Sequence, residues 1–180
     1  MKVYVMRHGT TVWNEKGITQ GRSRNRLSEK GKTLVLDAAL KFKDVSFDII
    51  FASPLMRTVQ TANIMNRYHS AKIIKDNRLI EIDQGIFTGR RKDSLTKEER
   101  DLKFARSGDC GLESYESVYE RTLSFVNELK NNSKFENVLI VTHNVNASLM
   151  EQILKGVNVD LGCRAHLRCF NNADVKFFEI

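Results

Sequence analysis

Apolar and polar residues alternate along the chain in segments that predict strands and helices in turn. Short runs rich in β-branched and aromatic residues predict buried strands at residues 2–6, 48–52, 71–75, 137–142, 165–170 and 174–178. Longer segments, with apolar residues three and four positions apart, predict amphipathic helices at about 28–42, 55–68, 96–106, 114–129 and 145–154. Such an alternation predicts an α/β fold, a three-layer sandwich with a mostly parallel central sheet.

One stretch breaks this alternation. Between Gly85 and Gly111 the chain is polar and charged, and it holds only the helix predicted at 96–106. We interpret this stretch as a small cap insertion over an edge of the sheet. The expected organisation is therefore a single domain over residues 1–180 with a cap at about 85–111.

Polar residues follow three of the predicted strands directly. Arg7 and His8 come after the first strand, Ser53 and Pro54 after the second, and His143 after the strand at 137–142. In open α/β sheets, ligands bind outside the carboxyl ends of the strands. One histidine there is more often a structural hydrogen-bonding group, but two at equivalent strand ends, beside arginine, form a suitable cradle for a dianion. The planar guanidinium matches the geometry of phosphate oxygens.

Composition narrows the class of protein. The chain has 180 residues, 41% hydrophobic and 28% charged, which excludes a disordered or collagen-like protein. Its three cysteines, Cys110, Cys163 and Cys169, cannot all pair with one another and suit a reducing compartment. No apolar run reaches the length of a secretory signal or a membrane span, so we expect a cytoplasmic protein with no membrane partner. The formal charge of +7 is compatible with nucleic acid, an acidic membrane surface or a small anionic substrate.

Several sequence motifs surround the polar strand ends. They are RHGTTVWN at 7–14, QG at 20–21, LSEKG at 27–31, SPLMRTVQTA at 53–62, LIEIDQG at 79–85 and VTH at 141–143. This ordered set resembles the motifs of the histidine phosphatase superfamily, in its phosphoglycerate mutase-like branch. A lone RHG would be weak evidence, whereas six motifs in the same order are specific.

The resemblance implies a mechanism through a phosphohistidine intermediate that needs no metal and no cofactor. His8 is then the nucleophile, and Glu81 protonates the leaving oxygen and later activates water. Arg7, Arg57 and His143 complete the implied catalytic set by binding the non-bridging phosphoryl oxygens. The implied substrate-binding residues are Arg7, Gly9, Asn14, Gln20, Gly21, Arg57, His143 and Asn144.

The sequence departs from the family pattern at three places. Arg22, Arg24 and Arg26 stand in a loop where the family usually has an acidic residue and a proline, and Arg90, Arg91 and Lys92 follow Thr88, where an acidic residue is usual. Asn144 replaces a common glycine after the second histidine. If both basic clusters border the pocket, the substrate carries a second anionic group; otherwise they form a solvated basic surface.

A zinc site is the other chemistry that the sequence suggests. Cys163, His166 and Cys169 are three residues apart, but on an extended strand such residues point to opposite faces. We therefore expect no metal site there.

These observations predict a phosphomonoester hydrolase, a metal-independent histidine phosphatase that acts on a small anionic phosphorylated metabolite. The alternative within the family is a phosphoglycerate mutase-type phosphoryl transferase, which must retain the phosphate in an enclosed pocket; the small cap favours hydrolysis. The alternative of another class is a non-catalytic anion or RNA binder. That alternative leaves Glu81 and both histidines unexplained, so nucleic acid is not the expected partner.

Overall fold

Five strands form one sheet in the computed structural model, which describes the whole chain except residues 107–109, 133, 163–166 and 168. The strands are β1 (Lys2–Arg7), β2 (Ile49–Ala52), β3 (Lys72–Lys75), β4 (Asn137–Thr142) and β5 (Val175–Glu179). Their spatial order is β3-β2-β4-β1-β5. The first four are parallel, and only β5 runs antiparallel, beside β1. This confirms the predicted α/β class with a mostly parallel sheet.

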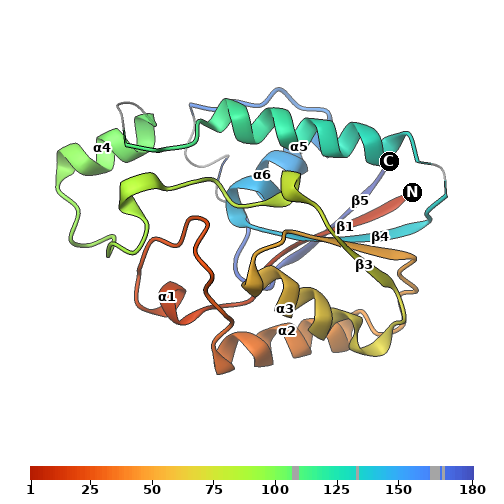
Figure 1. Ribbon diagram of the computed structural model, residues 1–180. Coiled ribbons are helices and arrows are strands. Elements are labelled where there is room, and N and C mark those ends of the chain that lie inside the picture. Colours follow the sequence, from red (N-terminus) through yellow and green to blue (C-terminus); the bar gives the residue numbers. More distant parts are fainter. Residues whose placement is uncertain (107–109, 133, 163–166, 168) are drawn as a thin grey trace.

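Helices cover both faces of the sheet (Figure 1). The helices are α1 (Val12–Glu15), α2 (Glu29–Lys41), α3 (Met56–Met65), α4 (Lys97–Ala105), α5 (Tyr115–Lys130) and α6 (Asn144–Lys155). Short 3₁₀ turns occupy Asn66–Tyr68, Asn77–Leu79 and Gly85–Phe87. One face carries α2 and α3, and the other carries α5 and α6.

The alternation of side chains along the two central strands divides the core. On β4, Val138 and Ile140 pack with α5 and α6, whereas Leu139 and Val141 pack with α2 and α3. Successive strand residues point to opposite faces, so a strand covered on both sides must be apolar at every position. This explains why 137–142 is so continuously hydrophobic, and β4 is accordingly a central strand of the sheet.

The strand predicted at 165–170 is wrong for the residues that can be assessed. Residues 163–166 and 168 lie outside the described part of the chain, while Leu167, Cys169 and Phe170 are not in a strand. The backbone N–H of Cys169 donates to the Ser148 hydroxyl, and that of Phe170 donates to Asn144 Oδ1. Side chains of α6 therefore satisfy these backbone groups in place of a neighbouring strand.

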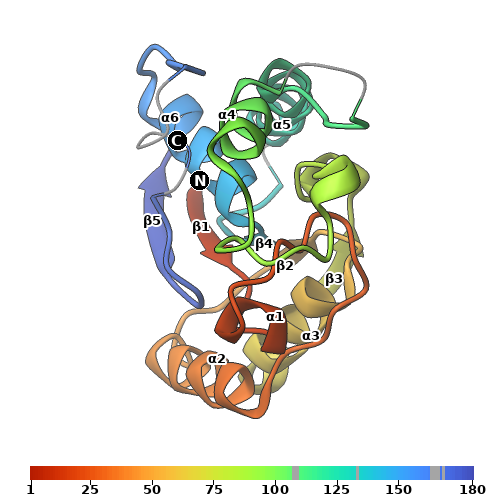
Figure 2. The ribbon, with the colours of Figure 1, turned by 90° about the vertical axis from the view of Figure 1, so that its left-hand side faces the viewer.

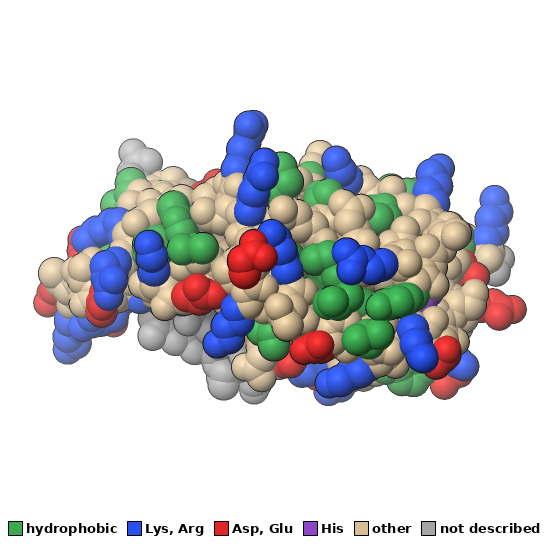
Figure 3. Space-filling model, turned by 90° about the horizontal axis from the view of Figure 1, so that it is seen from below, with side chains coloured by type: hydrophobic (Ala, Val, Ile, Leu, Met, Phe, Trp, Pro, Cys, Tyr) green, Lys and Arg blue, Asp and Glu red, His purple; other side chains and the backbone are tan. Residues whose placement is uncertain are grey.

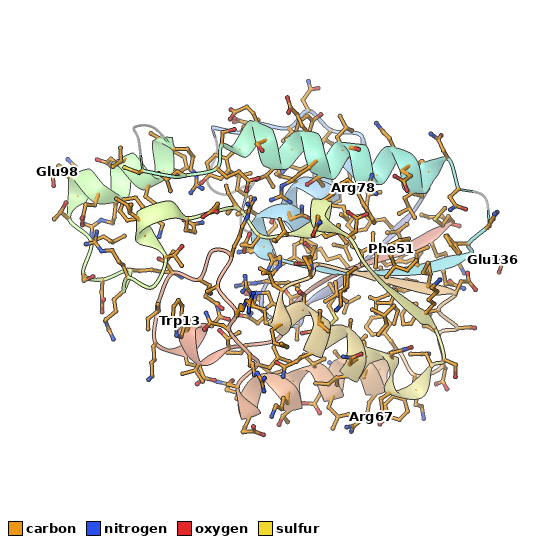
Figure 4. All side chains as sticks on the ribbon, in the orientation of Figure 1. Trp13, Phe51, Arg67, Arg78, Glu98 and Glu136 are labelled. Atoms are coloured by element: carbon orange, nitrogen blue, oxygen red, sulfur yellow. The ribbon has the colours of Figure 1, made fainter. Side chains whose placement is uncertain are left out.

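Segments 8–27 and 80–106 extend past the carboxyl ends of the parallel strands. Figure 2 views the molecule from this end, with α4 on the side of α5 and α1 on the side of α2. Trp13 and Glu98 lie at this end, whereas Glu136 lies at the opposite end (Figure 4). Backbone hydrogen bonds join the two segments, from Thr19 N–H to Arg90 O and from Gly89 N–H to Thr19 O.

The chain that follows β1 packs tightly against the start of α2. The Ser28 side chain caps this helix by accepting from Gly31 N–H, and Ser28 N–H donates to the carbonyl of Thr10. A Cβ on Gly31 would overlap that carbonyl oxygen, and a Cβ on Gly9 would overlap the Val35 side chain. Two glycines thus permit the close approach that fixes the backbone directly after β1.

Replacing Gly31 by alanine tests this close approach. Alanine in a helix normally stabilises by about 1 kcal/mol over glycine. Because the added methyl group would meet backbone, we expect Gly31→Ala instead to lower the free energy of unfolding, by about 1–3 kcal/mol. Urea denaturation measures the change, and Thr33→Ala, at an exposed position of the same helix, is the control, expected within about 0.5 kcal/mol of wild type. A stabilised Gly31→Ala protein would contradict the packing.

Candidate functional site

The order of the sheet brings the two histidines together. β1 and β4 are neighbours, with Arg7 paired to Thr142, so His8 and His143 each lie one residue beyond adjacent strand ends. Their ring centroids are 5.2 Å apart with an interplanar angle of 62°. β2 is the other neighbour of β4, and it leads through Pro54 into α3, whose second residue is Arg57.

The backbone fixes the orientation and tautomer of His8. Its Nδ1 lies 2.7 Å from the carbonyl oxygen of Gly9, which can only accept, so Nδ1 carries the proton. Nε2 then has the lone pair, and Arg57 Nε donates to it at 3.2 Å. The imidazole is thus a neutral base whose Nε2 lone pair accepts a hydrogen bond from a guanidinium.

Arg57 is fully buried and is held by backbone carbonyls. Its Nη1 donates to Ser23 O at 3.0 Å and its Nη2 to Gly21 O at 2.8 Å, in addition to the bond to His8. Gly21 has a positive φ of 48°, and a Cβ there would meet the Thr88 side chain. The loop at 21–23 therefore wraps around the guanidinium and fixes it beside the imidazole.

His143 is also fully buried. Its Nε2 lies 2.8 Å from the hydroxyl of Ser53, while its Nδ1 is a buried polar atom with no hydrogen-bond partner among the described residues. A buried polar atom normally has a partner, so this ring nitrogen is a donor or acceptor that the described residues leave unsatisfied.

A cavity of about 110 Å³ opens in front of His8. Eight of the residues that the sequence predicts for the site line it: Arg7, His8, Asn14, Gln20, Gly21, Arg57, Glu81 and Asn144. Gly9 and His143 do not line it. The lining that the prediction missed comprises Ile18, Thr19, Gln84, Lys103 and Val145, and Lys92 was predicted only as part of a basic cluster.

The structure gives Gly9 a different place from the one predicted. Its N–H donates to Thr61 Oγ1 at 3.1 Å, and its carbonyl accepts from His8. Gly9 therefore orients His8 and has no N–H left for an anion. Asn144 stands where the family commonly has glycine, but its backbone is helical and therefore does not need the left-handed conformation that glycine favours. Its Oδ1 accepts from Phe170 N–H.

The remaining polar groups of the cavity wall are oriented by local hydrogen bonds. Asn14 Oδ1 accepts from Thr11 N–H in a capping box of α1, which leaves the Asn14 amide nitrogen as a donor for a ligand. Gln20 Oε1 accepts from Thr11 Oγ1 at 2.9 Å. Arg7 Nη1 donates to the Phe170 carbonyl at 2.8 Å.

The two basic clusters do not both border the cavity. Arg24 and Arg26 are exposed and line no part of it. Arg22 pairs with Asp83 and Glu113, which ties its loop to the segment after Glu81. These three arginines therefore give no support to the hypothesis of a second substrate anion.

In the other cluster, Arg90 pairs with Glu99 and Arg91 with Asp93, so only Lys92 faces the cavity. Figure 3 shows Lys and Arg side chains spread over the α2–α3 face among acidic and hydrophobic ones. On that face the excess positive charge forms no single patch of the kind that binds nucleic acid.

Burial and charge shift the pKa values of the central groups. Burial, and then the charges of Arg57 and Arg7, hold the pKa of His8 well below its ordinary value; burial and Arg57 do the same to the pKa of His143. Burial lowers the pKa of Arg57 to about 10. Burial raises the pKa of Glu81, opposed by Arg57 and by the N–H of Ile82. The neutral imidazole of His8 thus lines the same cavity as a carboxyl group that gains a proton more readily than usual.

Metal ligands and membrane spans can be assessed over the described residues alone. Among them, no group of three or more His, Cys, Asp or Glu side chains could hold a metal ion. Cys163 and His166, two of the three residues considered for zinc, lie outside the described residues, and Cys169 is exposed. No described helix has both the length and the apolar character to cross a membrane.

The chain belongs to the histidine phosphatase superfamily (branch 1), whose family model matches residues 3–180. Phosphoserine phosphatase 1 of Hydrogenobacter thermophilus is 30% identical over 170 residues, 88% of this chain and 78% of that protein. The Escherichia coli protein named Probable phosphoglycerate mutase GpmB is 38% identical over 103 residues, which cover 57% of this chain and 48% of that protein. Membership confirms the family and the class of enzyme, a histidine phosphatase, that the sequence predicts.

A solved structure shows that the fold is shared along the whole chain. The α-ribazole phosphatase of Shigella flexneri superposes with a TM-score of 0.87 at 22% identity, covering 100% of this chain and 91% of that one. The three-layer arrangement described above is therefore the fold of that protein as well.

The protonation of the two buried histidines is open to a direct test. At about pH 6 a free imidazole is more than half protonated, whereas we expect His8 and His143 to stay neutral in the folded protein. The unfolded chain takes up these protons first, so the free energy of unfolding falls as pH is lowered through about 6.5.

Ring-proton NMR titration measures both residues, with His8→Asn and His69→Gln variants to assign the signals. His69 is needed for the assignment because burial also lowers its pKa. Folded-state midpoints for His8 and His143 at or above about 6.5 would contradict the electrostatics of the site.

Proposed function

We propose that the protein hydrolyses a small phosphomonoester through a phosphohistidine formed on His8. The observation that carries the proposal is the state of that imidazole. It is neutral, its Nδ1–H is held by the Gly9 carbonyl, and its Nε2 accepts from Arg57 at the cavity that both residues line. This is the protonation state that an attacking imidazole needs.

In the first step Nε2 of His8 attacks phosphorus while the ester P–O bond breaks. A phosphoryl oxygen takes the place of Nε2 as the acceptor for Arg57, and Arg7 binds the same group from the β1 side. The orphaned Nδ1 of His143 provides a further donor when protonated, or an acceptor for a protonated phosphoryl oxygen. These groups offset the negative charge that spreads over the equatorial oxygens.

Glu81 supplies the proton in this mechanism. Its raised pKa favours a protonated carboxyl group, which protonates the departing alkoxide and becomes a carboxylate. That carboxylate then takes a proton from water, whose oxygen attacks phosphorus as the N–P bond breaks. Inorganic phosphate leaves, and both His8 and Glu81 return to their starting states.

Hydrolysis is favoured over transfer by the size of the 85–111 segment, which we propose as the cap of a single 1–180 domain. Its one described helix, α4, has nine residues. A mutase must keep the phosphoryl group away from water until the substrate returns, and a small cap allows water to enter. Relatives carry both kinds of name, a phosphatase and a phosphoglycerate mutase.

The role of His8 is tested with a panel of phosphorylated metabolites. Wild type is expected to release inorganic phosphate and His8→Ala to lose at least about a thousandfold in kcat/KM, because the covalent route is removed. Brief quenching of wild type with a labelled substrate is expected to trap an acid-labile, base-stable phosphoryl group that His8→Ala lacks. Phosphate release that survives in His8→Ala would overturn the mechanism. Transfer between phosphoglycerates without net phosphate release would instead support the mutase.

The role of Glu81 is tested by varying the leaving group. Glu81→Gln cannot donate the proton, and we expect kcat/KM, which covers the steps up to departure of the alcohol, to fall about 10²–10⁴-fold for alkyl phosphates. The loss in kcat/KM is expected to be much smaller for p-nitrophenyl phosphate, whose leaving group departs as a stable anion. In wild type, kcat/KM for alkyl phosphates falls as pH rises through the pKa of Glu81, since the protonated form is the donor. Equal losses in kcat/KM on both substrates would exclude Glu81 as the acid.

A further inference from the structure

A second cavity of about 140 Å³ adjoins the one in front of His8. The two share Gln84, Lys92, Lys103 and Val145 in their linings, so these residues stand at the junction. The rest of its lining comes from the 85–111 segment and the start of α5: Leu95, Arg100, Phe104, Arg106 and Tyr115. A substrate whose phosphoryl group lies against His8 therefore extends past the two lysines and under α4.

Charge distinguishes this second cavity. Among the described residues that line it, four are cationic and none is acidic. The four are not equivalent. Arg106 is committed to the protein, because Nε donates to the Glu113 carbonyl, Nη1 to Gln84 Oε1 and Nη2 to the Asp83 carbonyl. Its guanidinium also lies over the Tyr115 ring, so it forms part of the wall.

The two lysines at the junction are differently placed. Lys103 Nζ donates to Thr19 Oγ1 at 2.7 Å and lies 5.6 Å from the centre of the buried Phe87 ring. Lys92 is anchored by its backbone, whose N–H donates to the Gly17 carbonyl. Both ammonium groups thus come from segments fixed against the loop that follows His8.

We propose that Lys92 and Lys103 bind a second anionic group of the substrate, carried by the part of the molecule that is not transferred. The proposal rests on the proposed phosphatase function and adds the substrate class: a small phosphomonoester with a carboxylate or a second phosphate a few atoms from the ester oxygen. The cations that recognise this group come from the 85–111 segment. The arginines at 22–26, which the sequence suggested for this role, do not take part.

The test compares substrates that differ in the second group alone. The set is 3-phosphoglycerate with a carboxylate, glycerol 1,3-bisphosphate with a second phosphate, and glycerol 3-phosphate with a neutral group. Wild type is expected to favour one or both anionic esters over glycerol 3-phosphate by about tenfold or more in kcat/KM, the worth of a charge-assisted hydrogen bond. Which anionic ester is preferred tells a carboxylate from a phosphate.

Lys103→Met and Lys92→Met are expected to reduce that preference to within about threefold, mainly by raising KM for the anionic ester. Methionine keeps the length and apolar stem of the lysine side chain, so packing on Phe87 survives, and the second variant guards against a folding defect in the first. Lys97→Met is the matched control, since it removes the same charge from an exposed position of α4 that lines neither cavity. It is expected to keep the wild-type preference.

Two results would overturn the proposal: a wild type with no preference for either anionic ester, or lysine variants that lose equally on all three substrates. Either result leaves the phosphatase function standing as long as phosphate is released. Failure of the function itself is distinguishable, because wild type would then release no phosphate from any of the three esters or from p-nitrophenyl phosphate.

Discussion

The hydrogen bond from His8 Nδ1 to the Gly9 carbonyl is the contact on which the site depends. It sets the tautomer, and so leaves the lone pair on Nε2, the ring nitrogen beside Arg57. The backbone that supplies this carbonyl lies tightly against the start of α2, and glycine at positions 9 and 31 permits that close approach. Packing between a loop and a helix therefore holds the carbonyl that sets the tautomer of His8.

Arg57 is the second requirement, and it is physically unusual. A fully buried guanidinium is normally matched by a carboxylate, yet its hydrogen bonds run to two carbonyl oxygens and to His8. Dipoles satisfy the donors without cancelling the charge, which agrees with a pKa lowered to about 10 by burial. The charge of Glu81 acts in the opposite direction and raises the pKa of Arg57. In the proposed mechanism a dianionic phosphoryl group adds further negative charge beside the guanidinium.

The sequence predicted most of the fold because its elements are marked locally. Ser28, Thr96 and Ser114 each cap the helix that was expected to begin there, and the continuous apolar run at 137–142 is the central strand β4. The strand expected near 170 fails because a buried Phe170 satisfies its backbone through Asn144, and no local pattern distinguishes that from a strand.

The chemical centre was predictable for a different reason from its surroundings. Strand ends of a parallel sheet converge by topology, so His8 and His143 could be brought together without knowing any side-chain direction. A residue that is close to a motif in the sequence need not lie close to the site. Arg24 and Arg26 lie directly before the LSEKG motif, yet both are exposed. Lys103 belongs to no motif, and its place at the cavity depends on which face of α4 turns inward, a matter of tertiary packing.

The residues around His8 and the residues at the junction of the two cavities come from different parts of the fold. The groups around His8 come from strand ends and helix starts that the core holds rigidly. The groups at the junction come from the 85–111 segment, joined to residues 17–19 through backbone hydrogen bonds that no side-chain replacement removes. Substitutions at Lys92 or Lys103 therefore leave the backbone around His8 in place. Under the proposed function, substrate selection and bond cleavage depend on different parts of the chain. Changes in the side chains of the 85–111 segment can therefore adapt the same catalytic centre to different phosphomonoesters.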